Sequence, residues 1–593
     1  MVQDLIKEQL SLSLQKLYGT NLSAQDISIE QTSDDFEGDF TFVVFPYLKI
    51  SRKNPEQTAN DIGNELLVQT ELFASFNVIK GFLNLIVKEQ FWLGFIAKEA
   101  SNQSFGLAEP NTKESVLVEY SSPNTNKPLH LGHIRNNLLG FSVAQILKAN
   151  GHKVFTCNLV NDRGIHICKS MLAWMRYGNG ETPNSAGIKG DHLVGKYYVV
   201  FDKHYKKEIE DLIATGLTEE DAKKNAPIIL AAQELLLKWE QNDPETIAVW
   251  EMMNNWVYAG FEKTYQKLGV QFDKYYYESN TYLLGKEIVQ EGLEKNVFYK
   301  KENQSVWIDL SEDGLDQKLV LRGDGTSVYI TQDLGTAELK YNDFNCNRSI
   351  YVVGNEQDYH FKVLQKIAQK LDKPYADGIF HLSYGMVELP EGKMKSREGT
   401  VVDADDLIAT MEETAAETTK ALGKMEGESD SELQSLYHTI GMGALKYFLL
   451  KVDPKKKMMF NPAESIDFQG NTGPFIQYTH ARIKSILRNA GEINALSFDS
   501  SKVQLSKIEK NLLVKLYQYL LVIKEAGRDL SPGVICNYVF DLAKAYSSFY
   551  HDHQVLNESN LDQRALRILT CKLTAQVIQS GFGLLGISVP EKM

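Results

Sequence analysis

Two histidines three positions apart, His130 and His133, follow Pro128 and stand where a helical pattern begins. Side chains at this spacing lie on one face of a helix start. The free backbone N–H groups and the positive end of the helix dipole there form an anion site. Gly132 between them leaves room for a flat ring or a phosphate to approach the backbone. No third metal ligand stands nearby at a useful spacing, so the pattern favours a nucleotide over a metal.

A second cationic loop occurs much later in the chain, where residues 392–399 read Gly-Lys-Met-Lys-Ser-Arg-Glu-Gly. Lysines bracketed by glycines suit a loop that closes on a phosphate chain. Taken alone, such a loop is better explained as an exposed basic turn. Because both loops occur in one chain, in this order, we interpret them together as a nucleotide site.

The histidine pair lies within a strand, loop, helix, strand pattern. Residues 116–120 and 152–159 are apolar and strand-like, residues 121–129 are rich in Ser, Asn and Pro, and residues 134–150 are helical. This βαβ unit predicts a parallel sheet with ligands at the carboxyl ends of its strands. The chemistry is therefore expected in the loop before the helix.

Other segments predict the rest of the organisation. Strand-like stretches at 305–309, 327–331 and 349–353 predict the second half of the same sheet, and the polar, helical residues from about 178 to 266 predict an insertion between the halves. The 593 residues then divide into an α+β domain (1–111), an α/β domain (112–465) and an all-α helical domain (466–593).

The charge of the chain is unevenly distributed. Lys and Arg number 63 against 77 Asp and Glu, a formal net charge of −14, so any polyanion must be bound by local basic patches. Residues 466–593 are the basic part: Arg482, Lys484 and Arg488 follow Tyr478 and His480, a mixture suited to unpaired RNA bases. A solvated helix face is the alternative, and the charge count alone favours it.

The five cysteines are widely spaced, with no Cys-x-x-Cys pair. This usage predicts a reducing compartment and no structural zinc. The first residues form an amphipathic pattern with acidic side chains, unlike a secretory signal, and no apolar run is long enough for a membrane span. We therefore expect a cytoplasmic protein that does not bind a membrane.

The two loops resemble a known pair of motifs. His-Leu-Gly-His at 130–133 and Lys-Met-Lys-Ser-Arg at 393–397 resemble the signatures of class I aminoacyl-tRNA synthetases. Further segments resemble arginyl-tRNA synthetases, among them Val-Glu-Tyr-Ser-Ser-Pro-Asn (118–124), Tyr-x-Thr-x-Asp (329–333), Gly-Asn-Thr-Gly-Pro-Phe (470–475) and the terminal Pro-Glu-Lys-Met (590–593). The resemblance implies a Rossmann-like catalytic domain with a helical insertion, an N-terminal tRNA-binding domain and a helical-bundle domain that binds the anticodon.

A site that selects arginine needs carboxylates, because a guanidinium is planar, always charged and offers forked N–H donors. The resemblance implies Glu119 and Asp333 for this role, with Tyr329 beside them and Asn124 holding the amino-acid end. Without this resemblance, Glu119 would be interpreted as a carboxylate on an edge strand that faces water. The pattern Gly-x-x-Gln-x-x-His at 354–360 implies further pocket or nucleotide contacts from Gln357 and His360.

The second motif departs from the family pattern Lys-Met-Ser-Lys-Ser. Lys395 comes one place early, and Ser396 stands where the second lysine belongs. In family members that share this loss, a lysine just before the first motif is the substitute, a position that Lys127 matches. Two alternatives stay open: Lys395 does the work, or Lys127 is merely an exposed loop residue.

The implied reaction is that of an arginine–tRNA ligase, an EC class 6 enzyme. ATP activates L-arginine to arginyl-adenylate, which is transferred to the 3′ end of tRNA(Arg), with release of AMP and pyrophosphate. Charge growing on the phosphates would be stabilised by His130, His133, Lys127 and Lys393, with Mg²⁺ entering with ATP and no metal held by protein ligands. Further ATP contacts are expected from Gly132, Met394 and Ser396, and tRNA contacts from Tyr478, Arg482, Arg488 and Met593. The family also suggests a monomer that needs bound tRNA before it activates arginine.

Two other classes of protein share part of this pattern. A nucleotidyltransferase with a similar sheet would have both loops but no use for the outer domains. A tRNA-binding protein without catalysis would keep the outer domains but lose loop residues, whereas His130, Gly132, His133 and Lys393 are all present. Pyrophosphate exchange with each amino acid, with and without tRNA, separates the three.

Overall fold

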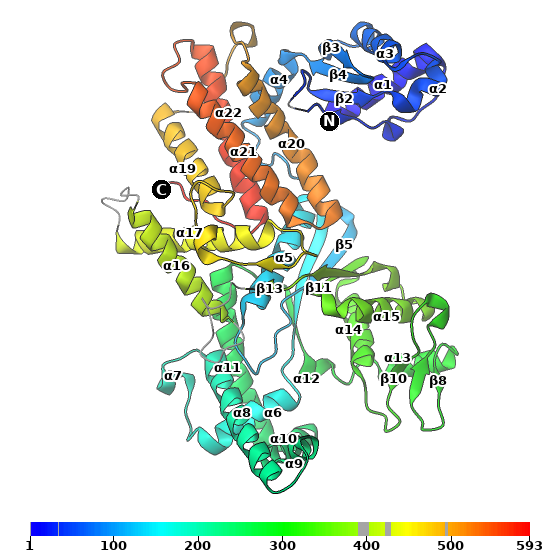
Figure 1. Cartoon of the computed structure of the whole chain (residues 1–593), viewed down its shortest axis with the longest axis vertical. Coiled ribbons are helices and arrows are strands. Elements are labelled where there is room, and N and C mark those ends of the chain that lie inside the picture. Colours follow the sequence, from blue (N-terminus) through cyan, green and yellow to red (C-terminus); the bar gives the residue numbers. More distant parts are fainter. Residues whose placement is uncertain (1, 34, 389–401, 422–428, 493–495) are drawn as a thin grey trace. The chain divides into compact units, whose positions relative to one another are not determined.

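A computed structural model of the chain describes residues 2–33, 35–388, 402–421, 429–492 and 496–593 (Figure 1). Contacts group the chain into two compact units. One comprises Met1–Phe105, Ile483–Tyr519 and Asp541–Val577, and the other Gly106–Arg482, Leu520–Phe540 and Ile578–Met593. The C-terminal helices thus contribute to both units. The boundaries expected at 111/112 and 465/466 follow the order of the sequence and stay a prediction.

The first unit begins with an α+β fold. A four-stranded antiparallel sheet has the order β1-β2-β4-β3. In β4 the residues Leu83, Leu85 and Val87 alternate inward and are buried, as expected for a sheet that is apolar on one face. Its elements are α1 (Val2–Tyr18), β1 (Glu30–Gln31), β2 (Phe40–Val43), α2 (Leu48–Ser51), α3 (Pro55–Gln69), β3 (Phe73–Ile79), β4 (Phe82–Val87) and α4 (Glu89–Glu99).

Segments of the C-terminal helices complete the core of this unit. Tyr517, on α20 (Lys507–Asp529), lies with its ring centroid 5.1–5.8 Å from those of Phe91, Trp92 and Phe95 of α4. Its hydroxyl accepts a hydrogen bond from the backbone N–H of Val2 at 2.5 Å. These contacts join the start of the chain to α20 in one packed core.

The second unit is built on a parallel sheet of five strands in the order β12-β11-β5-β6-β7. The strands are β5 (Asn111–Glu119), β6 (His152–Val160), β7 (Lys274–Tyr277), β11 (Arg348–Gly354) and β12 (Ile379–Tyr384). The chain runs outward from β5 through β6 to β7, and then returns to the other side of β5 for β11 and β12. Strand order therefore reverses between β5 and β11, which is where doubly wound sheets bind ligands.

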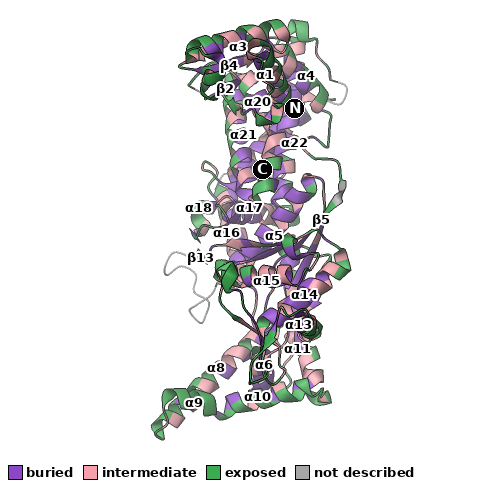
Figure 2. Ribbon diagram, turned by 90° about the vertical axis from the view of Figure 1, so that its right-hand side faces the viewer, coloured by how far each residue is buried: buried purple, intermediate pink, exposed green. Residues whose placement is uncertain are grey.

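Helices cover both faces of this sheet (Figures 1 and 2). On one face, Tyr120 packs so closely on α5 (Leu131–Ala149) that a Cβ at Gly140 would lie 2.3 Å from the tyrosine ring. On the other face, Leu117 and Cys157 form a buried cluster with side chains of α14 (Tyr329–Phe344) packed against it. Because side chains alternate along a strand, Glu119 shares the α14 face with Leu117.

Between β6 and β7 the chain is helical, and between β7 and α14 it forms small elements. These are α6 (Ile165–Tyr177), α7 (Pro183–Ala186), α8 (Gly190–Ala214), α9 (Glu219–Asn225), α10 (Pro227–Glu240) and α11 (Pro244–Leu268), followed by α12 (Glu278–Thr281), α13 (Lys286–Glu294), β8 (Tyr299–Lys300), β9 (Val306–Ile308) and β10 (Lys318–Leu321).

One sheet assignment and one strand prediction were wrong. Residues 306–308 form a strand, β9, as predicted, but β9 belongs to a separate antiparallel sheet, β10-β9-β8, and does not join the parallel sheet. Residues 329–331, predicted as strand from their β-branched and aromatic side chains, form the first turn of α14. The Thr331 hydroxyl accepts the N–H of Val328 at 3.2 Å, so a local bond starts the helix and overrides β propensity.

The rest of the chain is mainly helical. It contains α15 (Asp358–Lys370), β13 (Val387–Glu388), α16 (Ala404–Ala421), α17 (Asp430–Leu450), β14 (Met458–Met459), α18 (Pro462–Ser465), α19 (Gly473–Ala490), α20, α21 (Pro532–Asp552) and α22 (Leu561–Leu584). None of the helices formed by the described residues combines the length and apolar character needed to cross a bilayer.

Candidate active site

The predicted site residues gather at the carboxyl edge of the parallel sheet. The loop that carries Asn124, Lys127 and His130 follows β5, and the turn that carries Gln357 and His360 follows β11. These are the two neighbouring strands between which strand order reverses. The fold therefore brings both segments to the position where α/β sheets bind ligands.

The chain turns sharply where it leaves β5. Ser121 and Ser122 have φ values of 80° and 45°, a left-handed conformation that is costly for residues other than glycine. Buried asparagines hold it: Asn136 accepts the N–H of Ser121 at 2.6 Å, and Asn158 accepts the N–H of Ser122 at 3.0 Å. Bonds from α5 and β6 thus fix the strained turn between Glu119 and the histidine loop.

His130 and His133 hold each other at the start of α5. His130 is the N-cap, and its Nδ1 accepts the N–H of Gly132 at 3.1 Å, while Nδ1 of His133 accepts the N–H of His130 at 3.1 Å. The two ring centroids lie 3.9 Å apart. Both rings are therefore oriented by the backbone, as in a capping box.

Both imidazoles are neutral. Burial, then the nearby charge of Lys127, lower the pKa of His130 to about 4, although Asp403 acts in the opposite direction. Burial, followed by His130 and Lys127, holds the pKa of His133 well below its ordinary value. Since each Nδ1 accepts a backbone N–H, the single ring proton must be on Nε2. The pair thus offers two neutral Nε2–H donors, suited to phosphate oxygens.

Glycines let the chain approach closely around this pair. A Cβ at Gly132 would lie 2.9 Å from Cε1 of His130, so the His130 ring occupies the space that the sequence suggested for a ligand. At Gly195 of α8, a Cβ would lie 2.8 Å from Pro128 and 3.7 Å from the Cα of Lys127. The loop before the histidines is therefore packed directly on the helical insertion.

Arg135, two residues after His133, lies at the candidate site, and no pattern in the sequence indicated it. It is buried, and its guanidinium donates to the carbonyl oxygens of Gly385, Met386, Pro454 and Lys456 at 2.8–3.3 Å. Gly385 and Met386 come shortly before the second cationic loop. The helix that presents the histidines thus also fixes the chain leading into that loop. Lys393, Met394 and Ser396 lie outside the described residues.

The segment that follows the second cationic loop is hydrogen-bonded to the loop that carries the histidines. Leu131 donates its N–H to the carbonyl of Val402 at 3.0 Å, and Ala404 donates to the carbonyl of Leu129 at 3.0 Å. His192 of α8 lies 3.2 Å from the Asp403 carboxylate. Burial alone would lower the pKa of His192, but its contacts with Asp403 and a second carboxylate, Asp405, raise it to about 10.

Glu119, the last residue of β5, is already part of an ion pair. Its side chain is 8% exposed, and its Oε2 contacts Nζ of Lys340, whose side chain is 3% exposed. The thiol of Cys157 lies 3.6 Å from the same oxygen. Burial alone would lower the pKa of Lys340, but the Glu119 charge outweighs it and raises it. Lys340 is thus charged and forms an ion pair with Glu119, which does not simply face water.

Asp333 is the more accessible carboxylate, with 38% of its side chain exposed. Nε2 of His360 lies 2.6 Å from its Oδ2, so the structure brings these two predicted residues together. Tyr329, one turn earlier on α14, is 81% exposed. Gln357 and Asn124 are exposed at the same edge of the sheet.

The residues predicted to contact RNA lie on or beyond α19. The Arg482 guanidinium lies 4.8 Å from the ring centroid of Tyr478. His480 is buried and its Nδ1 lies 3.0 Å from the carbonyl of Pro590, so it holds the end of the chain. Arg488 follows on the last turn of α19, and Met593 is the last residue.

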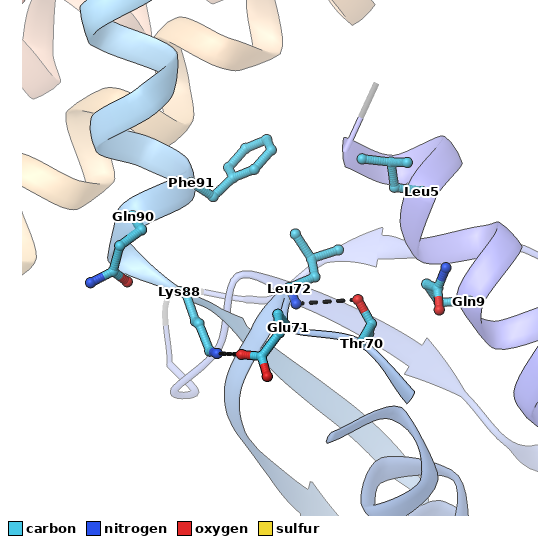
Figure 3. Close-up of a pocket in the computed structure, with 8 residues that line it drawn as sticks. All are labelled: Leu5, Gln9, Thr70, Glu71, Leu72, Lys88, Gln90 and Phe91. Atoms are coloured by element: carbon cyan, nitrogen blue, oxygen red, sulfur yellow. Dashed lines mark hydrogen bonds and ion pairs between the residues drawn. The ribbon is translucent and has the colours of Figure 1, made fainter. Parts of the chain in front are cut away.

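Two cavities lie away from these residues. One, in the first unit, has a volume of about 430 Å³. Figure 3 shows Phe91 and Leu5 on opposite sides of it and the Lys88–Glu71 ion pair at its edge. The other, in the second unit, has a volume of about 240 Å³ and is lined mainly by tyrosines of α11 and β7. Neither contains a residue that the sequence predicts for catalysis.

The fold and the histidine site together define a class I aminoacyl-tRNA synthetase. The family model described as tRNA synthetases class I (R), catalytic domain, matches residues 98–461. The arginyl tRNA synthetase N terminal domain model matches residues 4–87, and the DALR anticodon binding domain model matches residues 476–593.

Whole-chain relatives narrow this class to one family. The chain is 55% identical over 595 residues to the arginine–tRNA ligase of Bacteroides thetaiotaomicron and 52% identical over 607 residues to that of Flavobacterium psychrophilum, with all of each chain covered. The chain belongs to the arginyl-tRNA synthetase family. The arginyl-tRNA synthetase structures of Thermus thermophilus and Plasmodium falciparum share its fold, each with a TM-score of 0.78. Their identities are 23% and 20%, with all of this chain and 100% and 99% of theirs covered.

Proposed function

We propose that the reaction takes place between the histidine pair of α5 and the Glu119–Asp333 carboxylates. The reaction itself is that of an arginine–tRNA ligase: ATP activates arginine, and the activated amino acid is transferred to tRNA. The arginine carboxylate attacks the α-phosphorus of ATP and pyrophosphate leaves. A ribose hydroxyl of the terminal tRNA nucleotide then attacks the adenylate carbonyl, and AMP leaves.

The observation that carries this proposal is the backbone-held histidine pair at the switch point of the sheet. Its two neutral Nε2–H donors require no proton transfer, and they can stabilise charge that grows on the phosphates. Lys127 would supply positive charge beside them, and its effect on the pKa values of both histidines supports this role. We expect Lys393, Met394 and Ser396 to complete the ATP contacts.

Arginine is proposed to bind on the α14 side of the same strand end. The carboxylates of Glu119 and Asp333 would receive the guanidinium, and Tyr329 and Asn124 would bound the pocket. His360 reaches Asp333 in the structure, which supports a role on the arginine side; Gln357, on the same turn, is kept as a pocket or nucleotide contact. The two substrates would then meet above the carboxyl end of β5.

Mg²⁺ is proposed to enter with the ATP phosphates. Among the described residues, Asp191, His192 and Asp405 form the one group that could hold a metal ion. Lys189 lies 3.2 Å from Asp191 and also contacts Asp405, and His192 carries a raised pKa. These cations already neutralise the carboxylates, so the group does not fit a resident metal ion.

The tRNA contacts, oligomeric state and location are also proposals. Tyr478, Arg482 and Arg488 on α19, and Met593 at the chain end, are proposed to contact tRNA through stacking and phosphate pairing. The matches to an N-terminal and an anticodon binding domain of this family support outer domains that bind RNA. We further propose a cytoplasmic monomer.

Pyrophosphate exchange tests the function and its dependence on tRNA. Exchange should require arginine and should be near zero without tRNA, because RNA binding would supply ordering energy that the altered second motif lacks. A coupling free energy of about 3 kcal/mol gives roughly a hundredfold effect. Robust exchange in nuclease-treated, tRNA-free enzyme would show that the active site is already assembled without RNA.

A further inference from the structure

Lys340 is a buried charge for which the proposed mechanism has no use. It lies on α14 with 3% of its side chain exposed, and it contacts Oε2 of Glu119. Its ammonium also lies 4.9 Å from the ring centroid of Tyr351 and 5.9 Å from that of Tyr276. A lysine is rarely buried to this extent unless it is paired, so its position reflects a specific requirement.

The helix places Lys340 on the same face as the predicted pocket residues. Tyr329, Asp333 and Lys340 are four and then seven positions apart, a spacing that aligns side chains along one stripe of an α-helix. The strand register completes the arrangement, because Glu119 stands directly between Tyr351 of β11 and Cys157 of β6. One stripe of α14 thus faces the end of β5.

Both contacts to Glu119 are made to one of its two oxygens. Lys340 and Cys157 approach Oε2. Oε1 accepts no hydrogen bond and no ion pair from any residue that the structure describes. An ionised carboxylate can accept on both oxygens, so the pair leaves one acceptor of Glu119 available.

We propose that Lys340 is a positioning residue of the arginine pocket, which holds Oε2 of Glu119 so that Oε1 receives the substrate guanidinium. This inference rests on the proposed function of Glu119. The formal charges of Glu119, Asp333 and Lys340 sum to one negative charge, which a single guanidinium neutralises.

The variants Lys340→Met and Lys340→Arg test this role in the full-length enzyme. Methionine keeps the length of the side chain and removes its charge, so KM for arginine in aminoacylation should rise about a hundredfold, while KM for ATP stays within about twofold. Arginine keeps the charge and should recover most of the loss. The double variant Glu119→Gln/Lys340→Met should be no worse than Glu119→Gln, because the two residues act together.

Lys373→Met is a matched control for stability. The Lys373 side chain is 9% exposed, and it pairs with Glu338 of α14 at 2.5 Å and with Glu291 at 2.7 Å, without contacting Glu119. Its removal should lower the melting temperature as Lys340→Met does, yet leave KM for arginine unchanged. A purely structural role of Lys340 would make the two variants alike.

The outcomes distinguish this proposal from the function on which it rests. If Glu119→Gln raises KM for arginine and Lys340→Met does not, Glu119 binds the arginine guanidinium without being positioned by Lys340. The positioning role is then overturned. If Glu119→Gln itself leaves KM for arginine unchanged, the proposed pocket fails and this inference fails with it. A parallel rise in the ATP and arginine KM values of Lys340→Met would also overturn it.

Discussion

The two sides of the proposed active site are built on opposite electrostatic principles. On the nucleotide side, His130 and His133 are neutral and are oriented by backbone N–H groups. On the arginine side, Glu119 and Lys340 are both buried and charged, and side chains orient each other. The two sides begin at the same strand end, one on the α5 face and one on the α14 face.

The difference follows from what each side has to do. ATP brings its own negative charge, so neutral donors can stabilise charge that develops on its phosphates without having to be desolvated as ions. Arginine must be distinguished from other amino acids by its charge and fork, so its side needs a fixed carboxylate. A buried carboxylate needs a partner, and Lys340 provides one.

Removing the charge on the arginine side should have the largest effect. Glu119→Gln leaves Lys340 and the guanidinium unpaired in a buried place, and should cost roughly 2–5 kcal/mol in kcat/KM for arginine. Asp333→Asn should cost less, since Asp333 is 38% exposed and water can replace part of its role. Steady-state aminoacylation measures both, and equal or absent losses would contradict the contrast between the two carboxylates.

On the nucleotide side, substitutions of His130 can separate its role as the N-cap of α5 from its role as a hydrogen-bond donor through Nε2. In His130→Asn the side-chain oxygen can still accept the N–H of Gly132, but the Nε2–H donor is lost, so adenylation should slow by about 10²–10³-fold while the helix start stays stable. His130→Gln should have the opposite effects. Its amide N–H reaches farther and can still donate, so adenylation is slowed less, but the cap is lost and the helix start is less stable. Single-turnover rates and melting temperatures of the two variants decide it. A faster His130→Asn than His130→Gln would contradict the assignment of donors.

Lys127 should act on the rate and not on arginine affinity. Its positive charge is needed mainly when charge grows on the phosphates, so Lys127→Ala should slow adenylation by roughly tenfold to a hundredfold with little change in arginine binding. Lys395→Ala, in the second loop, is the comparison. A larger loss in rate for Lys395→Ala in single-turnover kinetics would show that the shifted lysine of the second motif does the work.

The smallest effect concerns stability at different pH. The pKa of folded His130 is about 4, below that of an unfolded histidine, so its contribution to the free energy of unfolding is lost as pH falls from about 6.5 towards 4. His192, with a pKa of about 10, stabilises below about pH 6.5, and this contribution is lost as pH rises towards 10. The free energy of unfolding, measured with denaturant at several pH values, should fall less steeply towards acid pH in His130→Asn than in the wild type. It should fall less steeply towards alkaline pH in His192→Gln. If the acid slope of His130→Asn equals that of the wild type, this would contradict the neutral histidine pair.

The sequence predicted the nucleotide side better than the arginine side. Its short strand, polar loop and helix start are local features, and the structure has β5, α5 and β6 where the pattern placed them. The arginine side depends on α14, whose first turn was predicted as a strand because Val328, Tyr329 and Ile330 favour strands. With that turn helical, Asp333 and Lys340 fall on one face.

The residues that the sequence did not indicate are also those whose partners are distant in sequence. Arg135 bonds to carbonyl groups more than 200 positions away, and Lys340 pairs with a strand residue from the other half of the sheet. No local pattern marks such pairs. The one signal for Lys340 in the sequence was its spacing, seven positions after Asp333, which places both on one face of a helix. That signal can be used only if residues 327–331 are correctly interpreted as the start of a helix.

A crystal structure of the enzyme with arginine, a non-hydrolysable ATP analogue and tRNA would test the contrast most directly. We expect guanidinium nitrogens at hydrogen-bonding distance, about 2.7–3.2 Å, from Oε1 of Glu119 and from Asp333, with Lys340 still on Oε2. We also expect phosphate oxygens at Nε2 of His130 and His133. A guanidinium bound away from Glu119, or phosphates that leave both Nε2 atoms without contact, would contradict it.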